Sequence, residues 1–233
     1  MKRAQKTNFR FYIDVLICCV IFVLIASGDA PMCEENAGIK LPEPRYSSGI
    51  SIETALRERR SVRSYTDEPL TVEEVSQLLW AAQGITNERG FRTAPSGGAL
   101  YPLELYILAG NVSGLSDGLY RYIPQGHQLV KIRNGDMRTE LYEATLNQSS
   151  VNTAPIVLVF SSVWQRITKK YGERGKRYAI IESGHAAQNV YLQAVSLGLG
   201  TVAVGAFRDN DVKSVIGMKD GEDPLYILPV GKK

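Results

Sequence analysis

Two arginines and a serine at alternating positions form the first group of residues that could do chemistry. They are Arg59, Ser61 and Arg63 in the run RRSVR. If the chain is extended there, the three side chains point the same way, because successive side chains of an extended chain alternate. A guanidinium donates two parallel hydrogen bonds to phosphate oxygens, so the pattern predicts a phosphate-binding group. On this run alone, the solvated basic end of a helix is the alternative.

A glycine-rich segment at residues 94–102, APSGGALYP, is the second candidate. Gly97 and Gly98 permit a planar ligand to approach the backbone closely, and Ser96 supplies a hydroxyl. A plain turn is the alternative. The run GLGTVAVG at residues 198–205 superficially resembles a nucleotide-binding loop, but such a loop leads from a strand into a helix. Here a helix is expected to lead into a strand, so we exclude that interpretation.

Other kinds of site lack the residues that they need. His127 and His185 are the only histidines and no HExxH or CxxC spacing is present, so the sequence predicts no metal site. No GxSxG run supplies a serine nucleophile. Beyond the first fourteen residues the chain holds 23 basic and 23 acidic residues. This balance argues against nucleic acid as a partner, because binding nucleic acid requires a net basic face.

The first thirty residues have the layout of an export signal. Four basic residues and one acidic residue in the first fourteen precede an unbroken apolar run, VLICCVIFVLIA, at residues 15–26. This layout predicts a secretory signal peptide or an N-terminal membrane anchor at residues 1–30, and therefore an exported or membrane-anchored protein. Residues 31–50 are rich in Pro, Glu, Gly and Ser and are predicted to be a linker. Residues 51–233 form the expected domain.

The expected helices and strands do not strictly alternate along the domain. Ser51 as an N-cap and a capping box of Thr71 and Glu74 predict helices at residues 52–60 and 71–84. Apolar runs rich in β-branched residues predict strands at 103–110, 118–123, 128–133, 155–163, 201–207 and 224–231. Further helices are expected at 136–148, 177–197 and 209–216. The domain is therefore predicted to be α+β.

Four runs, taken together and in order, resemble the nitroreductase superfamily. They are RRSVRSYTDEPLTVEEVSQLLWAAQG, RTAPSGGALYPLELYIL, RYAIIESGHAAQNVYLQAVSLGLGTVAVGAF and LYILPVG. The likeness spans about residues 50–233 and is strongest to the SagB-type branch, the flavin-dependent azoline dehydrogenases. It implies a nitroreductase-like fold, with a central, mostly antiparallel sheet flanked by helices. It also implies an FMN enzyme that forms a homodimer with the flavins at the subunit interface.

The resemblance implies cofactor-binding roles for nine residues: Arg59, Ser61, Arg63, Pro95, Ser96, Gly97, Gln148, Gly205 and Ala206. The first three match the family's phosphate-binding residues, and 95–97 match a loop that typically reaches the other subunit's flavin. Positions 205 and 206 match backbone amides that face the isoalloxazine ring, and position 148 matches a polar side chain at its edge. Relatives carry further basic residues after the last strand, where this chain offers only Lys232 and Lys233.

The implied function is oxidoreduction, with hydride transfer between FMN and a small organic substrate. NAD(P)H would reduce a nitro or quinone-type acceptor, or a peptide-derived azoline ring would be dehydrogenated. Azoline-oxidising relatives place a lysine and a tyrosine near the substrate, and Lys170 and Tyr171 are the counterparts here, with a solvated basic loop as the alternative. A second hypothesis is a membrane-anchored or exported protein that binds flavin without efficient turnover. The export segment motivates it, because NAD(P)H is normally absent outside the cytoplasm.

Overall fold

The computed structural model describes residues 38–233, so the predicted signal peptide or anchor at residues 1–30 lies outside the described part. Within that part, no helix has the length and apolar character needed to cross a membrane. Residues 38–44 of the expected linker pack in part against the domain. Leu41 is 2% exposed, and residues 39 and 40 form a short edge strand.

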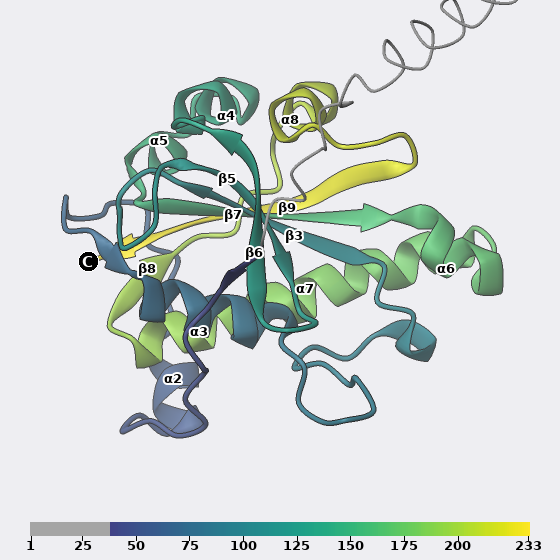
Figure 1. The fold of residues 1–233 in the computed structure, drawn as a ribbon, viewed down its shortest axis with the longest axis horizontal. Coiled ribbons are helices and arrows are strands. Elements are labelled where there is room, and N and C mark those ends of the chain that lie inside the picture. The colour runs from purple at the N-terminus through teal and green to yellow at the C-terminus, as the bar shows by residue number, and fades with distance from the viewer. Residues whose placement is uncertain (1–37) are drawn as a thin grey trace, which may run out of the picture. The chain divides into compact units, whose positions relative to one another are not determined.

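A seven-stranded sheet forms the centre of residues 38–233 (Figure 1). Every neighbouring pair of strands in it is antiparallel. A separate pair of short strands, β2 (Leu70–Thr71) and β4 (Val112–Ser113), is parallel. The order in the large sheet is β1 (Ile39–Lys40), β6 (Gln128–Asn134), β5 (Gly118–Ile123), β3 (Leu103–Ala109), β7 (Ile156–Val163), β9 (Glu222–Lys232) and β8 (Leu199–Thr201). The predicted α+β class is therefore confirmed.

Helices cover both faces of the sheet (Figure 1). One face packs against α3 (Val72–Gln83) and α7 (Arg174–Ser196), and α2 (Ile52–Glu58) lies against α7. The other face packs against α4 (Arg138–Ala144), α5 (Ser149–Thr153) and α8 (Asp209–Ile216). Because both faces are covered, neighbouring residues of β3 enter different cores, Ile107 one and Leu108 the other. This explains why β3 and β7 are almost continuously apolar.

The helix caps that the sequence predicted are confirmed. The Ser51 hydroxyl accepts a hydrogen bond from the Thr54 amide at 3.2 Å, and the capping box of Thr71 and Glu74 is complete. Helix α3 ends at Gly84, as expected. These side chains satisfy amides that the first turn of a helix leaves without a partner.

Other expectations were wrong in their limits. The expected helix at 136–148 is shorter, because α4 ends at Ala144 and Leu146 and Asn147 adopt left-handed φ values of 57° and 59° before α5 begins at Ser149. The expected strand at 201–207 ends at Thr201, and beyond it only Val204 forms an isolated bridge, with Ile227. A helix that the sequence did not predict, α6 (Trp164–Tyr171), follows β7 directly.

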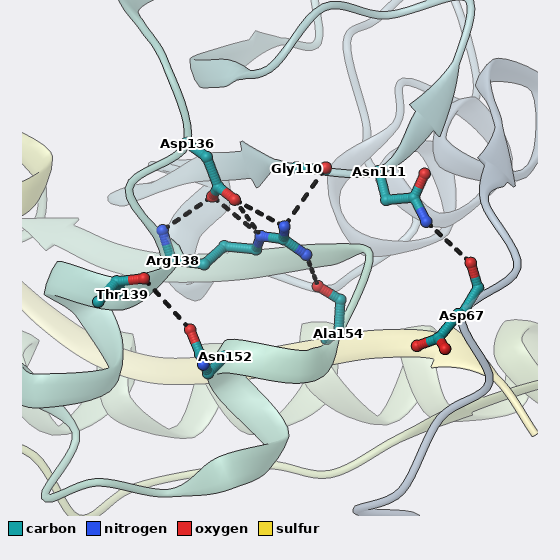
Figure 2. Close-up of polar contacts among 8 residues, drawn as sticks. All are labelled: Asp67, Gly110, Asn111, Asp136, Arg138, Thr139, Asn152 and Ala154. Carbon is teal, nitrogen blue, oxygen red and sulfur yellow. Dashed lines mark hydrogen bonds and ion pairs between the residues drawn. The ribbon is translucent and has the colours of Figure 1, made fainter.

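The start of α4 is tied to the end of β3 and the start of β7 through Arg138 (Figure 2). Its guanidinium donates to Asp136 at 2.6 Å, to the Ala154 carbonyl at 2.7 Å and to the Gly110 carbonyl at 3.3 Å. Partial burial raises the pKa of Asp136, but the hydrogen bonds and charge of Arg138 outweigh it, so the net pKa lies below its usual value. Arg138 thus joins three segments that are distant in sequence.

We expect Arg138→Met to lower the free energy of unfolding by about 2–3 kcal/mol. The variant keeps an aliphatic side chain but removes the guanidinium that donates to two carbonyls and to the Asp136 carboxylate, and the backbone amide of residue 138 still donates to that carboxylate. Chemical denaturation measures the loss. The exposed Arg133→Met on β6 is the matched control and should change stability by less than about 0.5 kcal/mol. Equal effects of the two changes would contradict the role of Arg138.

Candidate functional site

Tyr191 of α7 gathers part of the predicted phosphate-binding group. The Ser61 hydroxyl lies 3.2 Å from the Tyr191 hydroxyl, and the Arg59 guanidinium lies 5.2 Å from the centre of its ring. The Tyr191 hydroxyl also accepts a hydrogen bond from the Ala203 amide at 2.7 Å. The extended segment is fixed to β8, because the Val62 amide donates to the Thr201 carbonyl at 2.9 Å. Sequence reasoning missed Tyr191, which lies 130 positions from Ser61.

The other two arginines of the run behave differently. Arg63 is exposed and makes no side-chain hydrogen bond or ion pair with a described residue. Arg60 turns back and donates to the carbonyls of Arg57 at 2.9 Å and Arg59 at 2.8 Å. Arg60 nevertheless lines a cavity of about 260 Å³, together with Tyr191 and Lys233. The structure therefore brings Arg59 and Ser61 together, and it adds a terminal lysine beside the same tyrosine.

The segment predicted to face a flavin ring is held by Gln148. Its side-chain amide donates to the Ala206 carbonyl at 3.0 Å and to the Thr145 carbonyl at 3.1 Å. On the other side, Val204 and Ile227 exchange backbone hydrogen bonds of 2.8 and 3.0 Å. A methyl group added at Gly205 would meet only the Tyr226 ring, at 3.6 Å. The backbone at 205 and 206 is thus fixed in place and open to a ligand.

The loop at residues 95–98 packs against the beginning of α7. The Ser96 hydroxyl accepts the Tyr101 amide at 2.9 Å and so closes the loop, which continues into a short 3-10 turn, Gly97–Ala99. A methyl group added at Gly97 would lie 3.5 Å from Tyr178 of α7. Pro95 is exposed at the loop's start.

Lys170 and Tyr171 lie beside this loop. Gly98 has a left-handed φ of 63°, and a methyl group added there would lie 2.6 Å from the Tyr171 hydroxyl and 3.0 Å from the Lys170 amine. Glycine is favoured at this position, because a side chain would be strained at this φ and would displace the ends of the Tyr171 and Lys170 side chains. The two side chains are on the last turn of α6 rather than in a loop, and Lys170 is exposed there, so their role near a substrate stays a prediction.

Glu182 lies beneath the loop and is 2% exposed. Burial raises the pKa of its carboxyl to about 7, and the nearby Ser96 hydroxyl, Arg92 guanidinium and Gly97 amide only partly offset this. None of them reaches either carboxylate oxygen in good hydrogen-bonding geometry. Sequence reasoning missed Glu182, although an acidic residue within the small and apolar stretch of this helix is a visible signal.

Within one chain, the loop at residues 95–97 lies apart from Arg59 and Ser61. The loop contacts α7 around Tyr178 and Glu182, whereas Arg59 and Ser61 contact it at Tyr191. Nine residues of helix separate Glu182 from Tyr191, which corresponds to ~13 Å along the axis. Along this part of the helix, α7 exposes a stripe of residues to the surface. The stripe is formed by Ile181, Gly184, His185 and Gln188.

Glu182 should make stability depend on pH. A carboxyl whose pKa rises from 4.5 to about 7 on folding stabilises the native state fully at low pH, and this contribution is lost as the pH rises from 4.5 through 7. Relative to Glu182→Gln, the unmodified protein should lose up to about 3 kcal/mol over this window. Denaturation at a series of pH values measures the difference. The exposed Glu88→Gln is the control and should track the unmodified protein, and a Glu182→Gln difference that does not vary with pH would contradict the prediction.

Comparison with known proteins places these features in a family. The model of the Nitroreductase family matches residues 56–232. A Methanocaldococcus jannaschii protein classed as a nitroreductase, MJ1384, is 50% identical over 184 residues, which cover 79% of this chain and 92% of the relative. A solved structure from Ralstonia eutropha, also classed as a nitroreductase, superposes with a TM-score of 0.76 at 30% identity and covers 85% of this chain and 90% of its own.

Two more distant relatives have named activities or roles. The FMN reductase (NADPH) of Bacillus subtilis is 29% identical and covers 78% of this chain and 65% of its own. The microcin B17-processing protein McbC of Escherichia coli is 27% identical and covers 75% of this chain and 68% of its own. The predicted nitroreductase-like fold is confirmed, and we conclude that the chain belongs to the nitroreductase family.

Proposed function

We propose that the protein is an FMN-dependent oxidoreductase that transfers hydride between FMN and a small organic substrate, with NAD(P)H as reductant. Membership of a family that includes flavin reductases supports this. The single observation that carries it is the open, fixed backbone at Gly205 and Ala206, joined through Ala203 and Tyr191 to Ser61. A flavin carrier without turnover is not favoured, because the named relatives include reductases.

The residues of the chain fit FMN chemically. Arg59 and Ser61 would bind its phosphate, and Arg63, two residues after Ser61, and Lys233, which lines one cavity with Tyr191, would add charge. Backbone amides at 205 and 206 would face the ring, where a donor stabilises developing negative charge. The amide nitrogen of Gln148 is already bound to two carbonyls, which leaves its oxygen as an acceptor for a ring N–H. FMN, when bound, supplies the hydride chemistry, and the protein binds and orients it.

A second copy of the chain would complete this site. If two α7 helices pack antiparallel about Gly184 and His185, residue 191 of one copy faces approximately residue 179 of the other. The loop at Pro95, Ser96 and Gly97 lies over that part of α7, so it would meet the Arg59 and Ser61 group of the neighbour. The exposed stripe on α7 has a glycine at its centre, which permits close helix approach. We therefore propose a symmetric homodimer.

The substrate is proposed at the same place. Lys170 and Tyr171 lie against Gly98, at the end of the loop that would reach the flavin. This position and the likeness to McbC support the finer proposal of a SagB-type enzyme that acts on a peptide-derived ring. Reduction of nitro or quinone-type acceptors is the other substrate class. Export or anchoring through residues 1–30 is a proposal that rests on the sequence alone.

We expect the purified protein to be yellow, with about one FMN per chain. Arg59→Ala should weaken FMN binding roughly 10- to 100-fold, because it removes a charge-assisted phosphate contact of about 1.5–3 kcal/mol. Arg60→Ala should weaken binding less, because its donors are used by two carbonyls. Fluorescence titration of the apoprotein measures this, with the exposed Arg89→Ala as control. Protein that takes up no FMN would refute the proposal, and equal losses at 59, 60 and 89 would refute the phosphate site.

The dimer can be tested at Gly184 without disturbing one chain's fold. An added methyl group there meets nothing within 4 Å, so a larger side chain is accommodated within the monomer. Gly184→Leu should block close packing of two α7 helices, giving monomers that lose FMN. Gly184→Ala is the matched control and should remain dimeric. Light scattering and flavin fluorescence at rising dilution give both readouts, and Gly184→Leu monomers that retain FMN would show that one chain holds the complete site.

A further inference from the structure

A cavity of about 390 Å³ lies where β3 begins and β5 ends, next to α6. Three guanidiniums and one carboxylate line it, together with apolar side chains that include Leu100, Leu105 and Ile123. The charged residues are Arg92, Arg121, Arg166 and Glu104. The lining therefore holds an excess of two positive charges. None of the residues assigned above to the flavin contributes to this cavity.

Arg92 is held rigidly but its hydrogen-bonding capacity is little used. One nitrogen of its guanidinium donates to the Gln83 carbonyl oxygen at 2.8 Å, and its central carbon lies 4.4 Å from the centre of the Tyr101 ring. Gln83 itself is 1% exposed. Burial lowers the pKa of Arg92, and the charge of Glu182 partly restores it. A guanidinium has five N–H donors, so this one retains several for a ligand.

Arg121 and Arg166 add unequal charge to the cavity. Arg166 forms an ion pair with Glu104 and also donates to the Tyr101 carbonyl at 3.4 Å. Arg121, on β5, forms no side-chain hydrogen bond or ion pair with any described residue. Glu104 therefore compensates Arg166, and Glu182 partly offsets the charge of Arg92, whereas Arg121 has no ion-pair partner among the described residues. A planar guanidinium that has no ion-pair partner is suited to binding carboxylate and phosphate oxygens.

The cavity adjoins the place proposed for the substrate. Arg166 precedes Lys170 by four residues on α6, so the two side chains share one face of the helix. Leu100 and Tyr101 follow directly after the loop that carries Gly98. A molecule with its reacting part at Lys170 and Tyr171 could thus place an anionic end between the arginines. Its carbon skeleton would lie along the apolar lining.

We propose that this cavity binds the carboxylate or phosphate group of the substrate, so that the enzyme's substrate is an organic anion. The proposal rests on the proposed function in one respect: the bound anion is a substrate only if the protein is the proposed oxidoreductase. Anion binding itself depends on Arg92 and Arg121, because Arg166 is already paired with Glu104. Two kinds of ligand could supply the bound anionic group: a substrate with an acid group, or a nicotinamide nucleotide with a 2′-phosphate. We assign the cavity to the acid group of the substrate.

Calorimetric titration of the FMN-loaded protein tests the assignment. The probes are 4-nitrobenzoate and the neutral 4-nitrobenzyl alcohol, with NADP⁺ and NAD⁺ as a second pair. We expect the carboxylate to bind at least tenfold more tightly than the alcohol. Arg121→Gln should abolish this preference and Arg121→Lys should keep part of it. The exposed Arg133→Gln is the matched control and should keep all of it.

Each other outcome has a definite meaning. No preference for 4-nitrobenzoate, or a preference that survives Arg121→Gln, would overturn the proposal. If Arg121→Gln removes only the preference for NADP⁺ over NAD⁺, the site belongs to the nucleotide and the substrate assignment is wrong. FMN content and turnover are measured on the same samples. Protein without FMN that still distinguishes the two nitro compounds would refute the proposed function and leave the anion site standing.

Discussion

Close packing of α7 against the sheet is the constraint on which the rest of the site depends. The buried positions of this helix are mostly small: Gly175, Ala179, Ser183, Ala186, Ala187 and Ala194. Small side chains let the helix axis lie near β3 and β9, which leaves its opposite face at the surface of the domain. Tyr191 and Tyr178 can then project to either side and hold the arginine segment and the loop. A helix with larger buried residues would move both groups away from the sheet.

The sequence predicted those parts of the fold that local chemistry decides. The caps at Ser51 and Thr71 and the stop at Gly84 were read correctly, because each depends on a side chain and its next few amides. The left-handed residues Leu146 and Asn147 were not predicted, since neither is glycine and their conformation depends on tertiary packing. Helix α6 was missed because its polar residues have no cap and follow an apolar strand without a break.

The candidate site was predictable in its parts and unpredictable in its arrangement. Alternation in RRSVR predicted that Arg59, Ser61 and Arg63 share one side. Arg59 and Ser61 both contact Tyr191 and Arg63 does not, and no local signal connects the run to Tyr191, which tertiary structure brings close. Glu182 and Arg92 show the same limit. Their charges interact across 90 positions, and they join the loop to the arginine-lined cavity. A change of charge at Glu182 therefore changes the electrostatic energy of Arg92, because charges that are largely buried are screened less than exposed ones.

His127 has a consequence for the behaviour of the protein in mild acid. Its ring lies 2.7 Å from the Ser76 hydroxyl and 2.8 Å from the Tyr122 hydroxyl, and so it joins the turn between β5 and β6 to α3. Burial lowers its pKa, so the neutral ring is the folded form, and protonation as the pH falls opposes this arrangement. The Leu41 amide binds the His127 carbonyl, and β1 covers the edge of β6 beside it. Loosening this turn would uncover an unpaired strand edge, which is a template for aggregation between molecules. Mild acid therefore weakens the contacts that keep this strand edge covered.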